Sequence, residues 1–186
     1  IESLVADGVE LRQDLVTEME QQGIELAGRP VPALSEYFGD YEVFSAEEQL
    51  YEPMEGVEYL FKGFIDLVVK TPDGKYHILD WKTTSWGWDA KRRSDPMVTY
   101  QLTLYKYYFA RKHNIDLKMI ETHFALIKRT ATKDHVEIFR VTSGPRKTEN
   151  ALNLLKKAIY NIQKKKYIKN RLSCRGCEFR KTEYCR

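Results

Sequence analysis

Cysteine is scarce in this 186-residue chain and confined to one end: all three cysteines fall within the last 13 residues, and residues 1–173 contain none. An odd number of clustered cysteines argues against structural disulfides. Long hydrophobic runs are also missing, since no apolar stretch approaches the roughly 18 residues that cross a bilayer. No N-terminal segment resembles a signal peptide. We therefore expect a cytoplasmic protein that does not engage a membrane.

The composition is that of an ordinary globular domain, with 42% hydrophobic and 31% charged residues. The net charge of +3 conceals an asymmetry. Residues 146–186 contain 13 Lys and Arg against 3 Asp and Glu, a balance of +10, so the other 145 residues carry −7. A basic end beside an acidic body suits a polyanionic partner. A solvated, lysine-rich helix face is the alternative for the basic segment.

Hydrophobic periodicity predicts one α/β domain with a mixed central β-sheet flanked by helices. The expected order is helix, three strands, helix, two strands, helix, or α-β-β-β-α-β-β-α. Within this single domain we expect an N-terminal helical part over 1–40, a core over 41–142, and a basic C-terminal helix with a cysteine tail over 143–186.

The predicted elements are bounded by glycine, proline and polar turns. We expect helices over 2–22, 33–38, 96–113 and 145–166. Gly23 and Gly28-Arg29-Pro30 are expected to end the first helix, and the last is expected to bury Leu152, Leu155, Ile159 and Ile162. We expect a loop over 84–95 and strands over 41–51, 58–70, 75–83, 116–130 and 134–142.

Two of these strands each carry a carboxylate inside an apolar run. Asp66 lies in GFIDLVV and Asp80 in ILDWKTT, and a lysine follows at position 82. Because strand side chains alternate, Asp80 and Lys82 share a face, roughly 6.5 Å apart along the backbone. A buried carboxylate is costly unless it is paired or bound to metal. An isolated Asp-x-Lys is usually surface charge, but the combination predicts a site for a divalent cation and a phosphate, and hence phosphodiester hydrolysis.

Magnesium or manganese at such a site needs only one or two protein carboxylates besides phosphate and water. A further acidic group is expected on the preceding strand, where Glu47 and Glu48 are candidates. Since alternation lets only one of them face the site, we favour Glu48, acting directly or through water. Lys82 is expected to position or deprotonate the attacking water, or to hold a phosphate oxygen.

Gln101 and Tyr105 lie four residues apart on the helix that follows the lysine strand, so they share a face. Either can contact a nucleotide strand. A Gln-x-x-x-Tyr pair taken alone is more often ordinary helix surface.

Five features follow one another in the order typical of a known group of enzymes. They are GFID, a hairpin, ILDWKTT, a polar loop and YQLTLYKYY. In these motifs the chain resembles the PD-(D/E)XK nuclease superfamily and, within it, the RecB-type exonuclease branch. The resemblance implies a restriction-endonuclease-like core and metal binding by Asp66, Asp80 and the backbone carbonyl of Trp81. It also implies catalysis by Lys82, with Gln101 and Tyr105 in the branch's helix motif.

One departure from that pattern concerns the first helix. Many members of the branch carry a metal-binding histidine in a Gly-x-x-x-His pattern, whereas Gly8 is followed here by Arg12. This departure bears on a two-metal mechanism, and it motivates an alternative function, a nucleic-acid-binding module with impaired catalysis.

The loop after Lys82 combines aromatic and basic side chains. Two tryptophans in a polar loop beside three consecutive cations suggest base stacking and phosphate contact, without base-specific readout. The alternative is that one tryptophan closes the core and the cations are solvated. The candidate nucleic-acid-binding residues are Trp86, Trp88, Lys91, Arg92 and Arg93.

The cysteines form a Cys-x2-Cys pair, Cys174 and Cys177, followed by Cys185. This spacing is typical of metal ligands, for zinc or an iron–sulfur cluster, although a fourth cysteine is absent. Some members of the resembled branch hold a [4Fe–4S] cluster with three C-terminal cysteines and one near the N-terminus. Free thiols are the alternative.

These observations lead to the prediction of a Mg²⁺- or Mn²⁺-dependent deoxyribonuclease. We expect an exonuclease that acts on single strands or DNA ends in phage or bacterial recombination or repair. Partners consistent with this role are a second copy of the chain, a helicase or recombinase, or a single-strand-binding protein, and the basic tail is a candidate docking segment for a helicase complex.

Overall fold

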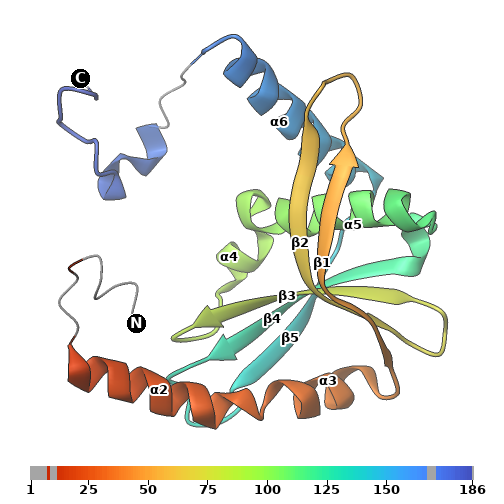
Figure 1. The fold of residues 1–186 in the computed structure, drawn as a ribbon, viewed down its shortest axis with the longest axis vertical. Helices are drawn as coiled ribbons and strands as arrows, with labels where there is room; N and C mark the ends of the chain where they lie inside the picture. The colour runs from red at the N-terminus through yellow and green to blue at the C-terminus, as the bar shows by residue number, and fades with distance from the viewer. Residues whose placement is uncertain (1–7, 9–11, 167–170, 186) are drawn as a thin grey trace. The chain divides into compact units, whose positions relative to one another are not determined.

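The computed structural model describes Gly8 and residues 12–166 and 171–185 (Figure 1). The chain comprises two compact units, Ile1–Thr148 and Glu149–Arg186. The first unit contains a five-stranded sheet with helices against it. The predicted α/β class with a mixed sheet is therefore confirmed.

The sheet has the strand order β1-β2-β3-β4-β5, which is also the order along the chain. Strands β3 and β4 are parallel, whereas the other neighbouring pairs are antiparallel. A parallel pair needs a long crossover, and helix α5 provides it. The strands are β1 (Glu42–Pro53), β2 (Leu60–Lys70), β3 (Tyr76–Thr84), β4 (Ile120–Lys128) and β5 (Val136–Val141).

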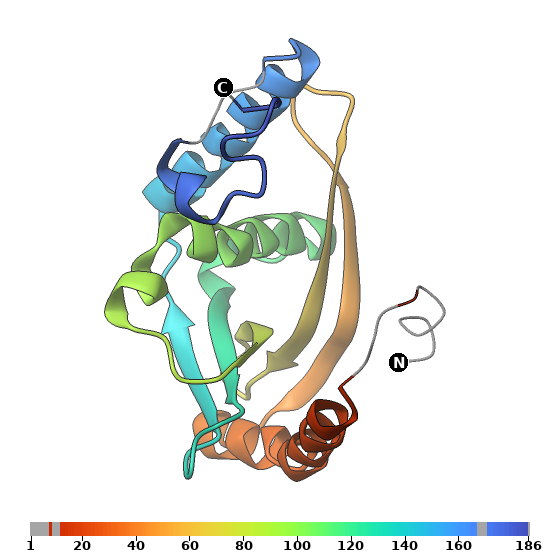
Figure 2. The ribbon, with the colours of Figure 1, turned by 90° about the vertical axis from the view of Figure 1, so that its left-hand side faces the viewer.

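Helices cover both faces of the sheet, with α2 and α3 on one side and α5 on the other (Figures 1 and 2). On the α3 side, Leu34 packs in a buried cluster with Val69, Leu79 and Ala125. The described helices are α2 (Gln13–Ala27), α3 (Pro30–Phe38), α4 (Ala90–Ser94), α5 (Pro96–His113), α6 (Pro145–Gln163) and the 3₁₀ turns η1 (Leu117–Met119) and η2 (Arg171–Gly176).

Strands β2 and β3 separate partway along their length. They pair from Lys70 opposite Tyr76 to Leu67 opposite Leu79, and the pairing stops there. Beyond that point β2 continues with β1 as a long hairpin, while β3 continues beside β4 (Figure 1). The next residues on the two diverging strands are Asp66 and Asp80.

Some predicted boundaries were wrong. Of the helix predicted over 2–22, residues 2–7 and 9–11 lie outside the described part of the chain, and α2 continues through Gly23 to Ala27. The predicted loop contains α4, because the Asp89 side chain caps it by accepting the N–H of Arg92 at 2.7 Å. In α6, Ile162 is 68% exposed, whereas Ala151 and Ile159 are the buried positions.

Candidate active site

Asp66 and Asp80 lie across from each other where β2 and β3 diverge. Continuing the register beyond Leu67 and Leu79 places the two aspartates opposite one another, with side chains on the same face. Asp66 Oδ2 accepts a hydrogen bond of 2.7 Å from the backbone N–H of Trp81. The Asp66 side chain thus accepts an N–H that a β2 carbonyl would accept if the two strands stayed paired. Both carboxylates lie where the two strands separate.

Asp80 is only 1% exposed and is held by two partners on one side of the sheet. Its Oδ1 accepts a hydrogen bond of 2.9 Å from Gln101 Nε2, and the Lys82 ammonium lies 2.6 Å from its Oδ2. Burial raises the pKa of the Asp80 carboxyl above its usual value, Lys82 opposes that shift, and the Asp66 charge adds to it. The shared face predicted for Asp80 and Lys82 agrees with this ion pair.

The Asp80 Oδ2 atom is buried and lies 2.6 Å from the Lys82 ammonium, and it makes no other polar contact among the described residues. A buried carboxylate oxygen with unused lone pairs, beside a second carboxylate, is a donor set that suits a hard divalent cation. The residues present therefore fit a divalent cation held by Asp66 and Asp80.

Gln101 and Tyr105 come from the same face of α5, as their spacing predicts. Gln101 Nε2 lies 3.1 Å from the Tyr105 hydroxyl as well as 2.9 Å from Asp80. A methyl group built at Gly63 would come within 2.7 Å of the Tyr105 ring, so a glycine on β2 lets this ring pack closely. In this arrangement Gln101 contacts Asp80 directly, a contact that the sequence pattern did not reveal.

The preference for Glu48 over Glu47 is not supported by the contacts. Glu48 accepts hydrogen bonds from Ser45, Lys112 and His113, at 2.5, 2.8 and 2.5 Å, and the last two belong to the C-terminal end of α5. Burial acts to raise the pKa of its carboxyl, but these hydrogen bonds outweigh burial and the pKa is lowered.

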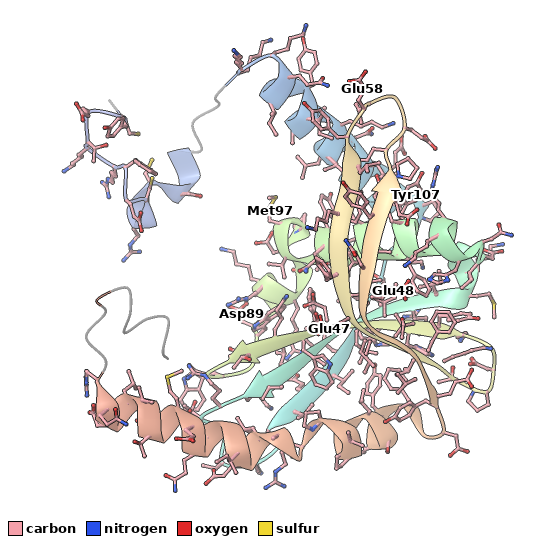
Figure 3. The ribbon with its side chains drawn as sticks, viewed as in Figure 1. Glu47, Glu48, Glu58, Asp89, Met97 and Tyr107 are labelled. Atoms are coloured by element: carbon pink, nitrogen blue, oxygen red, sulfur yellow. The ribbon has the colours of Figure 1, made fainter. Side chains whose placement is uncertain are left out.

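The register places Glu47 opposite Asp66, because Ala46 pairs with Leu67 and Glu48 with Ile65. Glu47 and Glu48 project to opposite sides of the β1–β2 hairpin, and Glu47 projects to the side of Asp89 and Met97 (Figure 3). Glu47 also has a left-handed backbone, with φ of 49°, a local irregularity that simple alternation does not anticipate.

The two loop tryptophans have different environments. Trp86 is 68% exposed, whereas Trp88 is 6% exposed and packs edge-on against Phe124 and Phe139. Trp88 therefore closes the core and cannot stack on a base in this conformation. Trp86 has the exposure that base stacking requires.

The three loop cations also differ. The Arg93 guanidinium binds Glu137 and the backbone carbonyl of Trp88, so it holds the loop to β5. The Arg92 guanidinium lies 4.5 Å from the centre of the Trp88 ring, a cation–π contact. Lys91 is exposed. Trp86 and Lys91 are consequently the exposed side chains of this set that take no part in these loop contacts.

Arg12 precedes α2 and forms an exposed ion pair with Asp14, while residues 9–11 of the Gly8–Arg12 pattern lie outside the described part of the chain.

In the second unit the three cysteines are free thiols, and Cys177 is exposed. No helix among the described residues is long and apolar enough to span a membrane.

This pairing of strand carboxylates with a neighbouring lysine at the split of a mixed sheet is the arrangement of a metal-dependent nuclease core. The model of the PD-(D/E)XK nuclease superfamily matches residues 5–186, and the chain belongs to that superfamily. No curated protein matches the chain.

Two solved structures are similar to this chain at low sequence identity. One is a "Putative exonuclease" from Eubacterium rectale, with 14% identity and a TM-score of 0.54, in which the match covers 85% of this chain and 58% of that one. The other is SSO0001, with 16% identity and a TM-score of 0.48, covering 96% of this chain and 73% of that one. The chain thus spans little more than half the length of the first of these proteins.

Proposed function

We propose that this protein is a Mg²⁺- or Mn²⁺-dependent deoxyribonuclease that hydrolyses phosphodiester bonds at DNA ends or in single strands. The observation that carries the proposal is the meeting of Asp66 and Asp80 where β2 and β3 diverge, with the Lys82 ammonium beside the buried Asp80 carboxylate. Membership of the nuclease superfamily supports the reaction class.

Asp66 and Asp80 would hold the cation, together with the Trp81 carbonyl and, by its place opposite Asp66, Glu47. When bound, a divalent ion lowers the pKa of a coordinated water and offsets charge on the phosphate. Glu48 remains a weaker candidate, because Lys112 and His113 already engage it.

Lys82 would bind the phosphate or orient the attacking water, because its ammonium lies beside Asp80 and its side chain is 36% exposed. Gln101 fixes the Asp80 carboxylate by donating to Oδ1, and Tyr105 supports Gln101. We assign both as positioning residues, which hold Asp80 in the orientation that the cation requires.

The test is cleavage of an end-labelled DNA strand and of a circular single strand in Mg²⁺ and in Mn²⁺. Wild-type protein should degrade the linear strand, and EDTA, Asp80→Ala and Lys82→Ala should each abolish the reaction. Glu36→Gln removes an exposed carboxylate on α3 and serves as the control that keeps activity. Cleavage of the linear but not the circular strand indicates an exonuclease.

Two results would reject the proposal. Activity that persists in EDTA and in both alanine variants places the reaction elsewhere. Salt-dependent DNA binding without turnover in either metal supports the impaired binding module that Arg12 suggested. If cleavage appears only after a helicase or recombinase from the native host is added, the protein is a subunit of that complex.

The cysteine tail is proposed to hold an iron–sulfur cluster with Cys174, Cys177 and Cys185 as ligands. Their free thiols and spacing support this, and a fourth ligand must come from elsewhere. Protein purified without oxygen should contain iron and absorb near 400 nm. A colourless, iron-free preparation of the longest native form excludes the cluster and leaves zinc or free thiols.

A further inference from the structure

A second group of metal-ligating side chains lies on the opposite face of β3 from Asp80. Because side chains alternate along the strand, His77 projects to the α3 side, where Phe38 packs against its ring. In the parallel register His77 lies opposite Glu121, and His123 lies two residues further along β4. His77, Glu121 and His123 each offer one ligand atom, and these three atoms lie within 4.8 Å of one another.

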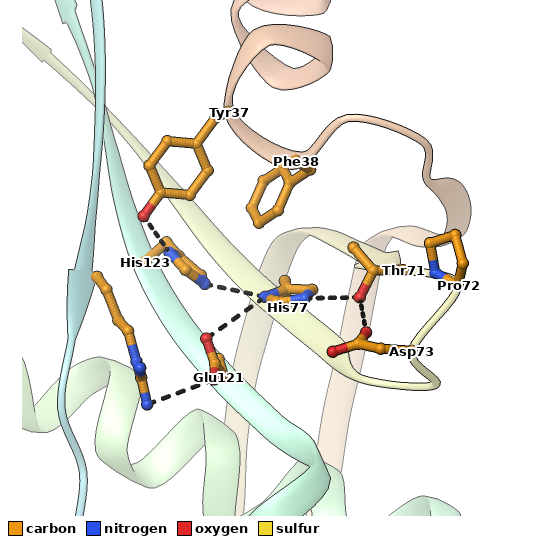
Figure 4. A pocket seen from close by; sticks show the side chains of 9 residues that line it. Tyr37, Phe38, Thr71, Pro72, Asp73, His77, Glu121 and His123 are labelled. Atoms are coloured by element: carbon orange, nitrogen blue, oxygen red, sulfur yellow. Dashed lines mark hydrogen bonds and ion pairs between the residues drawn. The ribbon is translucent and has the colours of Figure 1, made fainter.

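The hydrogen bonds around His77 define which of its ring nitrogens carries a proton (Figure 4). The Thr71 hydroxyl lies 2.5 Å from Asp73 and 3.0 Å from His77 Nε2. A hydroxyl has one proton, and the ionised Asp73 carboxylate can only accept it, so Thr71 accepts in turn from His77 Nε2–H. Burial lowers the pKa of His77, which keeps the ring neutral. His77 Nδ1 therefore presents a lone pair to the cluster.

His123 faces this lone pair with its own Nε2, at 3.1 Å. Its other nitrogen, Nδ1, lies 3.4 Å from the Tyr37 hydroxyl, and burial lowers the His123 pKa to about 3. One shared proton would satisfy the two imidazoles, but it would not engage Glu121 Oε2, the oxygen that faces them. Arg140 and Lys75 lie beside the other oxygen, Oε1, at 3.4 and 3.6 Å. The Glu121 Oε2 atom is 3.9 Å from His77 Nδ1, beyond hydrogen-bonding distance.

A cation would satisfy all three atoms at once. We propose that His77, Glu121 and His123 bind a Zn²⁺ ion through Nδ1, a carboxylate oxygen and Nε2, at a site separate from the Asp66–Asp80 site. Two histidines and one glutamate form a known zinc ligand set, and ligand distances of about 2 Å place ligand atoms 3–4 Å apart. The His77 Nδ1 atom lies 3.1 Å from His123 Nε2 and 3.9 Å from Glu121 Oε2, close to this range, and a small rotation of Glu121 would complete the set.

The surroundings have the features of a metal site. Each histidine bonds through its second nitrogen to a hydroxyl, Thr71 or Tyr37, which is the outer-shell support that ligating histidines receive. Glu121 Oε1 forms an ion pair with the Arg140 guanidinium at 3.4 Å, which fixes the position of the carboxylate. The cluster opens to a cavity of about 530 Å³, which gives an ion a route in and leaves its fourth position to water. Nitrogen ligands favour Zn²⁺ over Mg²⁺, so the two sites differ in metal preference.

The proposal is tested by titrating Co²⁺, a spectroscopic substitute for Zn²⁺, into protein held in excess Mg²⁺. Cys174, Cys177 and Cys185 are replaced by serine so that no thiol binds the probe. One equivalent should bind with the visible absorption of tetrahedral Co²⁺, and Zn²⁺ should displace it. Asp80→Asn should leave this binding unchanged.

Glu121→Gln removes the carboxylate charge while preserving its size, and it should weaken Co²⁺ binding at least 10-fold. Thr71→Val should weaken it by about 10–100-fold, since outer-shell support has effects of that order. His135→Asn, a histidine outside the cluster, is the matched control that should bind normally. Failure of the serine variant to bind Co²⁺ or Zn²⁺, or binding that survives Glu121→Gln and disappears with Asp80→Asn, overturns the assignment.

Discussion

The Asp66 carboxylate accepts the backbone N–H of Trp81 at 2.7 Å, at the point where β2 and β3 stop pairing. One oxygen of Asp66 thus joins the diverging strands, and the other is available to a cation. Asp66 therefore has two roles, a hydrogen bond between the strands and a charge for the cation. Substitutions that keep or remove its acceptor oxygen should separate the effect on stability from the effect on cleavage.

The first prediction concerns that separation. Asp66→Asn keeps an oxygen that accepts the Trp81 N–H but loses the charge, so the thermal midpoint should change little. Cleavage should fall about 100-fold or more, because charge stabilisation worth several kcal/mol is lost. Asp66→Ala should lose cleavage and also unfold at a lower temperature. Equal midpoints for the two variants would show that the hydrogen bond does not stabilise the strands.

Asp80 yields a prediction about pH. Burial raises its pKa above the ordinary value of 3.8, so folding favours the protonated carboxyl relative to the unfolded chain. Without metal, its contribution to stability is full below pH 3.8 and is lost as pH rises through the folded-state pKa. Asp80→Asn should therefore be more stable than wild type at pH 7 in EDTA, by about 2–4 °C in Tm for each kcal/mol gained.

Denaturation across pH in EDTA measures this difference, which should shrink toward zero near pH 3. Added Mn²⁺ should stabilise wild type and not Asp80→Asn, since the ion binds the charged carboxylate. A variant less stable than wild type at pH 7 would mean that the Lys82 ion pair outweighs the cost of burying Asp80.

The strand pattern could predict that Asp66, Asp80 and Lys82 lie together, as they do in the structure, because alternation and apolar flanks are local properties. It favoured Glu48, whereas the register places Glu47 opposite Asp66, because alternation indicates that only one of the two glutamates faces the site and not which one. The His77–Glu121–His123 cluster was missed for another reason. Its members come from strands that become neighbours only through the α5 crossover, and their register has no local signature in the sequence.

The two adjacent glutamates give a paired prediction. Glu47→Gln should reduce cleavage by about 10-fold or more with little change in stability, because Glu47 is exposed and lies opposite Asp66. Glu48→Gln should mainly destabilise the fold, by about 1–3 kcal/mol, because Lys112 and His113 lose a charged partner. Cleavage rates and urea unfolding measure both effects. The reverse pattern would restore Glu48 as the residue at the metal.

The loop tryptophans give a second pair of predictions, one for binding and one for stability. Trp86→Ala should weaken single-strand binding by about 1–3 kcal/mol, the range for one stacked base, with Tm unchanged. Trp88→Ala should cost about 3–5 kcal/mol of stability, because it empties a core position against Phe124. Fluorescence anisotropy with a labelled oligonucleotide and thermal unfolding separate the two. Unaltered binding by the Trp86 variant would exclude this ring from the DNA contact.

Gly63 gives the final prediction, because the Tyr105 ring of α5 packs closely against β2 at this glycine. The added methyl of Gly63→Ala would lie 2.7 Å from the Tyr105 ring and 3.3 Å from Phe61, and a buried ring has little room to move. We expect a loss of about 1–3 kcal/mol of stability from overpacking. Cleavage should fall further than stability explains, because Tyr105 supports Gln101 and Gln101 orients Asp80. The double variant Gly63→Ala with Tyr105→Leu replaces the ring with a smaller side chain and so removes the clash. It should recover stability without recovering the cleavage rate. If it recovers both, Tyr105 acts only as packing.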